Sequence, residues 1–377
     1  MKILQICSAR TIGGGEKHLV DLANGLHGRG HEVYAAIRPD SGLRAELQPL
    51  PEQNILPLQA QGLLNILNAF KLAQFIRERE VDVIHGHIAH DYLLAALAAK
   101  LAGRGKLVIT RHVLFQLNEL HTRMLKRVDR VIAVSQAVAD SLHGFDPTRI
   151  TVIHNGIDLS RFNRGSAASE WLQSFIESDL RRSFLVGMVG HLAPIKGQEE
   201  FIRAAAIVGC QRSDVVFVVA GEDKSRTGEN RQRLERLIKD LGLEGRVHLL
   251  GWVDDVPRLL SALDLLISPS RSEPFGLSIV EAIACGVPVI ATRSEGALEI
   301  LEDDVTGKLL ASGHPDELAA AIVSLLEDEE KRRRFVAQAL EVVSEKFALE
   351  SMVSATEQLY DSLFGDGSEP GGVATGE

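Results

Sequence analysis

The chain has 377 residues, of which 45% are hydrophobic and 24% are charged, and its formal net charge is −10. This composition excludes a disordered chain, and the length suits two medium-sized domains with their own cores. The acidic total argues against a general nucleic-acid binder, because such a protein needs a basic face to neutralise phosphates. Residues 1–170 contain 20 Lys or Arg against 16 Asp or Glu, a net +4, which leaves −14 for the remainder. The first half is therefore the one compatible with an anionic membrane or a phosphorylated acceptor.

The sequence shows neither a membrane span nor a secretion signal. No run approaches the roughly 18–20 consecutive apolar residues that a span needs, and the first apolar stretch, residues 2–7, is too short for a signal peptide. The three cysteines lie far apart in apolar settings, so neither a disulfide framework nor a zinc cluster is predicted from them. We expect a cytoplasmic protein.

Short apolar runs alternate with helical patterns from the start of the chain, which predicts parallel βα units. In the first half, strands are predicted at 3–7, 32–37, 55–58, 81–85, 106–110, 130–134 and 151–153, and helices at 16–27, 63–80, 92–102 and 114–126. After a turn and a short polar stretch the alternation restarts, with strands predicted at 184–189, 215–220, 247–250, 265–268 and 288–291. The pattern thus predicts an α/β protein with two doubly wound domains, residues 1–165 and 166–348, separated by a cleft.

The C-terminal region is different in character. Residues 349–364 read as a last amphipathic helix, which we expect to pack on the first domain. Residues 365–377 are rich in Gly and have no apolar periodicity, so we expect a disordered tail.

The most informative stretch is 270–281, where a predicted strand has just ended and a helix begins near Leu277. A helix start presents unpaired N–H groups and a positive dipole end, which suit a diphosphate. Glu273 precedes this helix start and Glu281 lies one turn inside it, so the two carboxylates can flank such a ligand. On its own, this pair is more typical of ordinary helix carboxylates.

In the first half, residues 13–15 are three glycines between a predicted strand and a predicted helix. Such a loop permits close approach of a phosphate or sugar, although the G-x-G-x-x-G pattern fails at His18. His112 directly follows the strand at 106–110, where strand ends of a doubly wound sheet line the ligand crevice. A plain tight turn and a rim histidine are the alternatives to these two functional interpretations.

A metal centre is the less favoured interpretation of the histidines at 85, 87 and 90. No carboxylate or cysteine cluster accompanies them, and the acidic pairs elsewhere do not follow a D-x-D pattern. We therefore expect no metal.

Four segments resemble a known family when they are taken together and in order. They are GGGEKH at 13–18, HNGIDLSRF at 154–162, VGHLAPIKG at 189–197 and SRSEPFGLSIVEAIACGVPVIAT at 270–292. They closely resemble the retaining glycosyltransferases of family 4, which have two facing Rossmann-like domains, the GT-B fold. The resemblance implies transfer of a sugar from a nucleotide-sugar donor, with UDP- or GDP-sugars expected, and retention of anomeric configuration without a metal or other cofactor. The implied acceptor is a glycan, lipid-linked or lipopolysaccharide-type molecule of the cell envelope.

The resemblance also implies roles for single residues on the donor side. Glu273 and Glu281 match the two glutamates of the family's E-x7-E motif, which contact the donor sugar and the ribose. Lys196 matches a lysine that binds the donor diphosphate. The arginine usually found beside it is replaced by His191, which is shorter and only partly charged near neutral pH, so Arg271 is a candidate substitute. Further donor contacts are implied at Gly14, Gly15, Val253, Phe275, Gly276 and Leu277.

The implied catalytic positions are His112, Lys196 and Glu273, with Glu16 and Arg111 on the acceptor side. Three alternative functions stay open: a sugar-nucleotide epimerase or hydrolase on the same fold, a non-catalytic sugar-binding homologue, and a two-domain binding protein of the periplasmic type. Residues 114–130 mix basic and apolar side chains, which fits either an ordinary solvated helix or peripheral docking of the first domain on the inner face of the membrane.

Overall fold

The computed structural model describes residues 1–58, 64–115, 122, 128–162, 168–173, 176 and 183–365. The chain divides into two compact units: the first comprises Met1–Val134, Ala139–Ile153 and the C-terminal part from Glu350, and the second comprises Ser135–Val138 and His154–Leu349. The helix predicted at 114–126 and the tail predicted at 365–377 fall almost entirely outside the described residues. The expected cleft between the domains stays a prediction.

The chain enters the second unit at His154, earlier than the boundary that we expected at residue 165. The reason is a backbone pairing between two segments that are distant in sequence. The N–H of Ile157 donates to the carbonyl of Phe347 at 2.9 Å, and the N–H of Leu349 donates to the carbonyl of Ile157 at 2.8 Å. Residues 154–162 therefore belong to the second unit.

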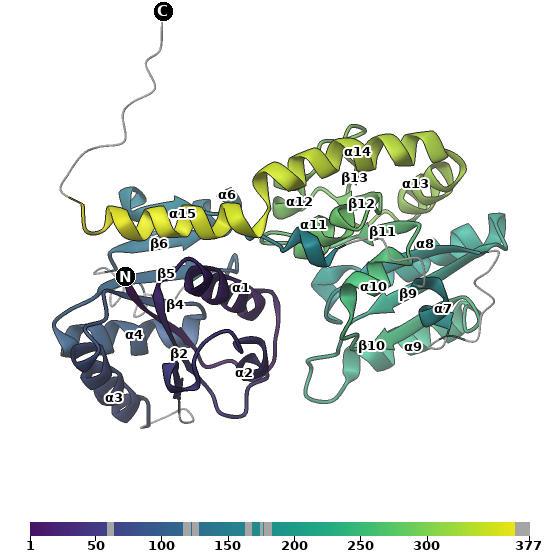
Figure 1. The fold of residues 1–377 in the computed structure, drawn as a ribbon. Helices are drawn as coiled ribbons and strands as arrows, with labels where there is room; N and C mark the ends of the chain where they lie inside the picture. The colour runs from purple at the N-terminus through teal and green to yellow at the C-terminus, as the bar shows by residue number, and fades with distance from the viewer. Residues whose placement is uncertain are drawn as a thin grey trace, which may run out of the picture. The chain divides into compact units, whose positions relative to one another are not determined.

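The first unit is built on a seven-stranded parallel sheet in the order β3-β2-β1-β4-β5-β6-β7 (Figure 1). Its strands are β1 Lys2–Cys7, β2 Glu32–Ile37, β3 Ile55–Pro57, β4 Val83–Gly86, β5 Lys106–Arg111, β6 Arg130–Ala133 and β7 Ile150–Val152. The residues of the five inner strands are nearly all buried because helices cover a parallel sheet, which explains why these strands read as apolar runs. The edge strands β3 and β7 are only partly buried.

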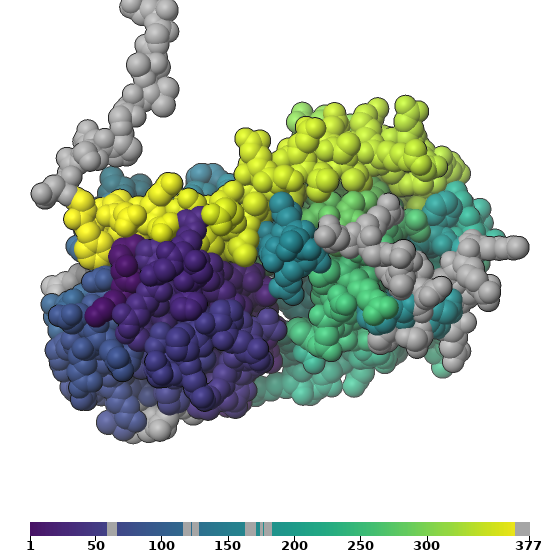
Figure 2. All heavy atoms as spheres, viewed as in Figure 1, coloured from purple at the N-terminus to yellow at the C-terminus, as the bar shows by residue number. Residues whose placement is uncertain are grey.

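The helices of the first unit are α1 Gly14–Gly28, α2 Leu43–Glu46, α3 Leu64–Glu78, α4 Ala89–Ala102 and, from the C-terminus, α15 Leu349–Ser362. Helix α6 Gln136–Asp140 begins among residues of the second unit and ends among residues of the first. Helix α3 packs against α4. Helix α15 lies against the N-terminal elements (Figure 2), and Gly25 of α1 leaves the space that Val353 of α15 fills. Arg29, the C-cap of α1, also forms ion pairs with Glu350 and Glu357 of α15. The last helix is thus an integral layer of the first unit.

The second unit has a six-stranded parallel sheet in the order β10-β9-β8-β11-β12-β13. Its strands are β8 Phe184–Val189, β9 Val215–Ala220, β10 Val247–Gly251, β11 Leu265–Ser268, β12 Val289–Thr292 and β13 Lys308–Leu310. The sequence pattern does not predict β13, because an edge strand of three residues carries too short an apolar run. The helices are α7 Ala168–Gln173, α8 Gln198–Gln211, α9 Glu229–Asp240, α10 Val256–Ser261, α11 Leu277–Ala284, α12 Glu295–Ile300, α13 Pro315–Glu327 and α14 Glu329–Lys346.

Both sheets share one topology. Counted from β1 in the first unit and from β8 in the second, each has the strand order 3-2-1-4-5-6, and the first sheet adds one strand. In sheets of this order, ligands bind beyond the carboxyl ends of the strands where the order reverses. These switch points lie between β1 and β4 and between β8 and β11. No helix in the described part of the chain is both long and apolar enough to cross a bilayer.

Candidate active site

At the switch point of the second unit, two of the predicted donor residues are in direct contact. Lys196 ends the 3₁₀ turn Pro194–Lys196 after β8, and Glu273 lies in the loop between β11 and α11. The Lys196 Nζ lies 2.6 Å from Oε2 of Glu273, and the two side chains are only 17% and 13% exposed. The loops that carry them are also joined, because the N–H of Arg271 donates to the carbonyl of Ile195 at 2.8 Å. The sequence therefore folds a lysine and a glutamate 77 positions apart into one site.

Two glycines allow these loops to meet. Gly197 has φ of 78°, and a Cβ at this position would lie 2.1 Å from the carbonyl oxygen of Pro269. Gly276 has φ of 104° and is the N-cap of α11, a conformation that a residue with a Cβ adopts only with strain. The chain thereby turns sharply into α11 and leaves the first N–H groups of the helix without intrahelical partners.

The start of α12 also fixes the loop that carries Glu273. The Glu273 N–H donates to Oε2 of Glu295 at 3.1 Å, and the Glu273 carbonyl accepts the N–H of Gly296 at 2.8 Å. A Cβ at Gly296 would lie 2.1 Å from the carbonyl oxygen of Phe275. Hydrogen bonds to the Glu273 backbone therefore help to fix the position of its carboxylate, together with the contact that the side chain makes with Lys196.

His191 stands at the exposed rim of this site, one residue after the Gly190 that follows β8. Desolvation of its ring lowers its pKa, and the ammonium groups of Lys196 and Lys224 lower it further. The imidazole is thus neutral near pH 7, so it does not supply the second cation that an arginine would. Arg271 is exposed, and its side chain makes no ion pair with any described residue.

The other predicted donor residues spread along the same edge of the sheet. Phe275 is 3% exposed and packs its ring against His154 and Phe347, with centroids 6.0 and 5.5 Å away. Leu277 and Glu281 are half-buried on α11. Val253 follows β10, two strands away from β8, which is roughly 10 Å at the usual strand spacing. The structure thus gathers Lys196, Glu273 and α11 closely and places Val253 at a distance suited to the far end of a long ligand.

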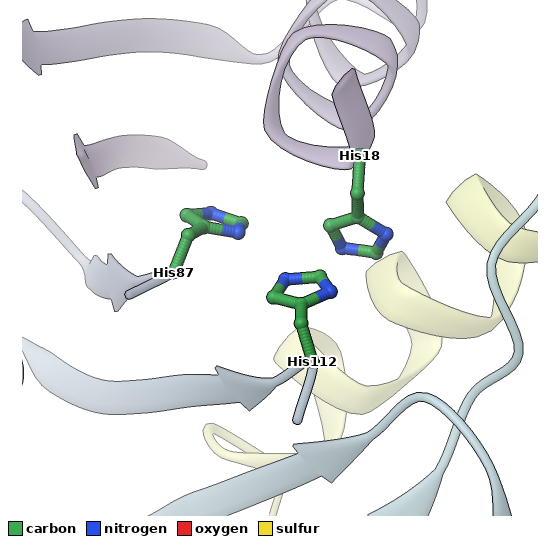
Figure 3. A group of neighbouring side chains, drawn as sticks. All are labelled: His18, His87 and His112. Atoms are coloured by element: carbon green, nitrogen blue, oxygen red, sulfur yellow. The ribbon is translucent and has the colours of Figure 1, made fainter. Parts of the chain in front are cut away.

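At the switch point of the first unit, the structure gathers a different set of groups. His112 follows β5, His87 follows β4 and His18 lies in α1 (Figure 3). One ring nitrogen of each lies within 4.8 Å of the other two. A Cβ at Gly15 would lie 3.2 Å from Cδ2 of His112, so the glycine loop and the predicted histidine are in contact. His18 and His87 were not among the predicted site residues.

Burial controls the protonation of these histidines. Desolvation holds the pKa values of His85, His87 and His112 well below the usual range, and neighbouring histidines lower them further. His87 Nε2 lies 2.6 Å from Oε1 of Gln5, so this nitrogen donates and Nδ1 carries the lone pair. His85 uses both nitrogens, with the Tyr360 hydroxyl at 2.6 Å and the Thr110 hydroxyl at 2.7 Å.

Other predicted residues of the first unit take different positions. Arg111 is 2% exposed, and its guanidinium donates to the carbonyls of Val113 and Phe115. It holds the loop after β5, and this placement differs from the acceptor-facing one that we expected. Glu16 is half-buried on the first turn of α1, and Gly14 beside it is exposed. His90 is exposed on α4 and lies outside the histidine group, so the trio 85, 87 and 90 does not form a site.

Two doubly wound domains of the same strand order define a two-domain Rossmann-like protein. The chain belongs to the glycosyltransferases. The family described as Glycosyltransferase Family 4 matches residues 12–161, and the family described as Glycosyl transferases group 1 matches residues 173–342. The predictions of a glycosyltransferase of family 4 and of two α/β domains with parallel sheets are confirmed.

Individual proteins of similar sequence and structure agree with this assignment. The chain is 28% identical to the N-acetyl-alpha-D-glucosaminyl L-malate synthase of Bacillus anthracis, over 94% of this chain and 96% of that protein. It is 28% identical to the lipopolysaccharide core biosynthesis glycosyltransferase LpsE of Rhizobium meliloti, over 93% and 96%. The crystal structure of Anabaena Alr3699/HepE in complex with UDP and glucose superimposes with a TM-score of 0.84 at 28% identity, covering 96% of this chain and all of that one.

Proposed function

We propose that this glycosyltransferase moves a sugar from a UDP- or GDP-sugar to its acceptor with retention of anomeric configuration and without a metal ion at the diphosphate. The observation that carries the proposal is the contact of Lys196 with Glu273 beside the start of α11. Support comes from the similar Anabaena protein, which has been solved with UDP-glucose. Of the two nucleotides, UDP is therefore the first to test.

The ion pair suggests how the site responds to the donor. A diphosphate at the start of α11 competes with the Glu273 carboxylate for the Lys196 ammonium. When Lys196 turns to the phosphates, the Glu273 carboxylate is released and accepts hydrogen bonds from the donor sugar. The Glu281 carboxylate accepts hydrogen bonds from the ribose. The ion pair thus holds the lysine in place before the donor binds, which lowers the entropic cost of ordering it.

The departing diphosphate is the centre of the proposed chemistry. As the bond to the sugar breaks, negative charge grows on the phosphate, where it meets Lys196 and the N–H groups at the start of α11. These donors are fixed by Gly197 and Gly276, so little reorganisation is needed. The phosphate oxygen then takes the proton of the acceptor hydroxyl, which attacks from the same face and retains the configuration.

The proposed acceptor is a saccharide or lipid-linked molecule of the cell envelope. One similar Escherichia coli protein is named for galactosyl transfer to a GlcNAc-diphosphoundecaprenol, and the similar LpsE is named for the lipopolysaccharide core. Helix α3 of the first unit exposes Ile66, Leu67 and Phe70 by half or more. This apolar group supports peripheral contact of the first unit with a membrane that holds such an acceptor.

The test is a panel of UDP-, GDP- and ADP-sugars, with nucleotide release measured with and without a lipid-linked oligosaccharide acceptor. We expect one donor to bind and to release nucleotide mainly when the acceptor is present, with Lys196→Ala and Glu273→Ala both impaired. Lys239→Ala, on the exposed side of α9, is the matched control. Equal nucleotide release without acceptor indicates a hydrolase, and conversion of the donor to another nucleotide-sugar without release indicates an epimerase. Donor binding without any turnover indicates a non-catalytic homologue.

A further inference from the structure

We propose that His18, His87 and His112 bind one first-row transition-metal ion of the Zn²⁺ type in the first unit. This site goes beyond the proposed function, in which no metal ion acts on the donor diphosphate. It rests on how the three imidazoles converge, on what their remaining nitrogens contact and on the elements that carry them.

The three rings come from separate elements and turn toward one point. Figure 3 shows one nitrogen of each ring directed into the space between them. These nitrogens lie within 4.8 Å of one another, so a point between them lies within about 2.8 Å of each. Zn–N bonds are about 2.0–2.1 Å long, so each nitrogen has to move inward by about 0.7 Å to bind an ion at that point. Side-chain rotations of that size leave the backbone in place.

The protonation and orientation of His87 suit a metal ligand. Its Nε2 donates to Gln5 Oε1 at 2.6 Å, so the lone pair resides on Nδ1. Metal-binding histidines typically donate their other N–H to an oxygen acceptor in this way, which fixes the tautomer and the ring orientation. Neither His87 Nδ1 nor the two nitrogens of His112 have a hydrogen-bond partner among the described residues, although all three are buried. Buried polar atoms normally pair with a protein group, an ordered water or an ion, so these nitrogens are available to a metal.

Three other histidines of the first unit are arranged differently. His85 has both nitrogens occupied by Tyr360 and Thr110, and His31 contacts Glu357 and the N-terminus. His90 is exposed. Among the described residues, only the trio of His18, His87 and His112 brings three metal-ligating side chains this close. Imidazole ligands select zinc, copper, nickel or iron over magnesium and calcium, which take oxygen ligands.

A bound ion would join α1 to the loops after β4 and β5. Three protein ligands leave a tetrahedral ion one open position, which can accept an oxygen of a second ligand. Gly15 stands directly against His112, so the glycine loop would close one side of that position. The site would thus stabilise the switch point of the first unit and offer it a Lewis acid.

The test uses the full chain, freed of metal with a chelator and then titrated with Zn²⁺ by calorimetry and with Co²⁺ by visible absorption. We expect one equivalent with micromolar or tighter affinity, tetrahedral Co²⁺ bands and a higher melting temperature with Zn²⁺. His87→Ala and His112→Ala should each weaken Zn²⁺ binding at least about 10-fold, since loss of a mere outer-shell partner already costs about that much.

His90→Ala in the first unit and His154→Ala in the second are the matched controls, and circular dichroism shows whether each variant is folded. If the folded wild type binds no stoichiometric Zn²⁺ or Co²⁺, or if His90→Ala weakens binding as much as His87→Ala, the proposal is wrong. Donor binding by the second unit is measured separately with UDP, so failure of the metal site and failure of the proposed function are distinguishable.

Discussion

The two units share one strand order and differ sharply in what stands at the switch point. The second unit places an ion pair, Lys196 with Glu273, beside a helix start. The first unit places three imidazoles and a glycine there. The comparison teaches that the topology fixes where a ligand can bind, whereas the side chains on the loops decide which ligand it is.

The same comparison shows why net charge is a poor guide to ligands. The half of the chain that carries −14 holds the site suited to a diphosphate, because Lys196 and the N–H groups of α11 act locally. The half that carries +4 holds a site in which burial lowers the pKa values of His87 and His112 and keeps these two rings neutral. Local desolvation and helix geometry outweigh distant surface charges, which water and salt screen.

The largest expected effect comes from a substitution in the site of the second unit. Lys196→Ala removes the cation that meets the leaving diphosphate, so kcat/KM should fall by a factor of about 10²–10³, comparable to loss of one oxyanion donor. Lys239→Ala should leave turnover unchanged. Steady-state kinetics with the best donor measure both, and equal activities of the two variants would contradict the assigned role of Lys196.

The next prediction disturbs the first site without adding or removing charge. In Gly15→Ala the new Cβ would meet the His112 ring at 3.2 Å, so the ring has to shift by a few tenths of an ångström. We expect turnover to fall about 10-fold, since misplacement of about 1 Å in an active site can cost 100-fold, while the Kd for UDP stays constant. Gly28→Ala in the same helix meets no atom within 4 Å and should behave as wild type, and a loss there equal to that of Gly15→Ala would refute the contact.

A smaller effect concerns His191, which stands where the family usually has an arginine as a second cation for the diphosphate. The pKa of His191 is lowered, first by desolvation and then by Lys196 and Lys224, so this histidine gains its proton only below its ordinary value of 6.5. UDP affinity should therefore rise as the pH falls, because the phosphate favours the protonated ring, and it should rise more in wild type than in His191→Gln. His191→Arg should tighten UDP about 3- to 10-fold at pH 7.5, as expected for one partly exposed cation. Calorimetry measures each Kd, and weaker binding by His191→Arg would argue against a phosphate at this position.

The smallest effect is on stability. Tyr360→Phe removes the hydroxyl that bonds to the buried Nδ1 of His85, so α15 loses a polar contact with the first sheet. We expect the free energy of unfolding to fall by about 1–2 kcal/mol, the typical cost of a buried group left unpaired, with UDP binding unaffected. Chemical denaturation measures the change. An unchanged midpoint would show that α15 is held by its apolar side chains and ion pairs alone.

Much of the fold follows from the sequence because each buried parallel strand is a separate apolar run. The bounds of β2, β8, β9 and β11 agree with the predictions to the residue. The three-residue strand β13 is missing from the predictions, since a run that short has no pattern of its own. The entry into the second unit at His154 also escapes local patterns, because it depends on backbone pairing of Ile157 with Phe347 and Leu349.

The sites were predicted in part. Lys196, Glu273 and His112 come from motifs, and the structure places the first two in contact. The grouping of His18 and His87 with His112 depends on which strands are neighbours, and spacing along the chain does not reveal that. The sequence does hold a signal for this grouping. Each of these histidines stands just after a strand or near a helix start, and a doubly wound sheet brings such positions to one edge.

A crystal structure of the protein with UDP-glucose tests the central claim most directly. The account predicts that the diphosphate lies at the start of α11, that Lys196 Nζ has left Glu273 to contact a phosphate oxygen, and that the Glu273 carboxylate accepts a hydrogen bond from the sugar. A nucleotide bound elsewhere, or a Lys196 that still contacts Glu273 with the donor in place, would contradict it.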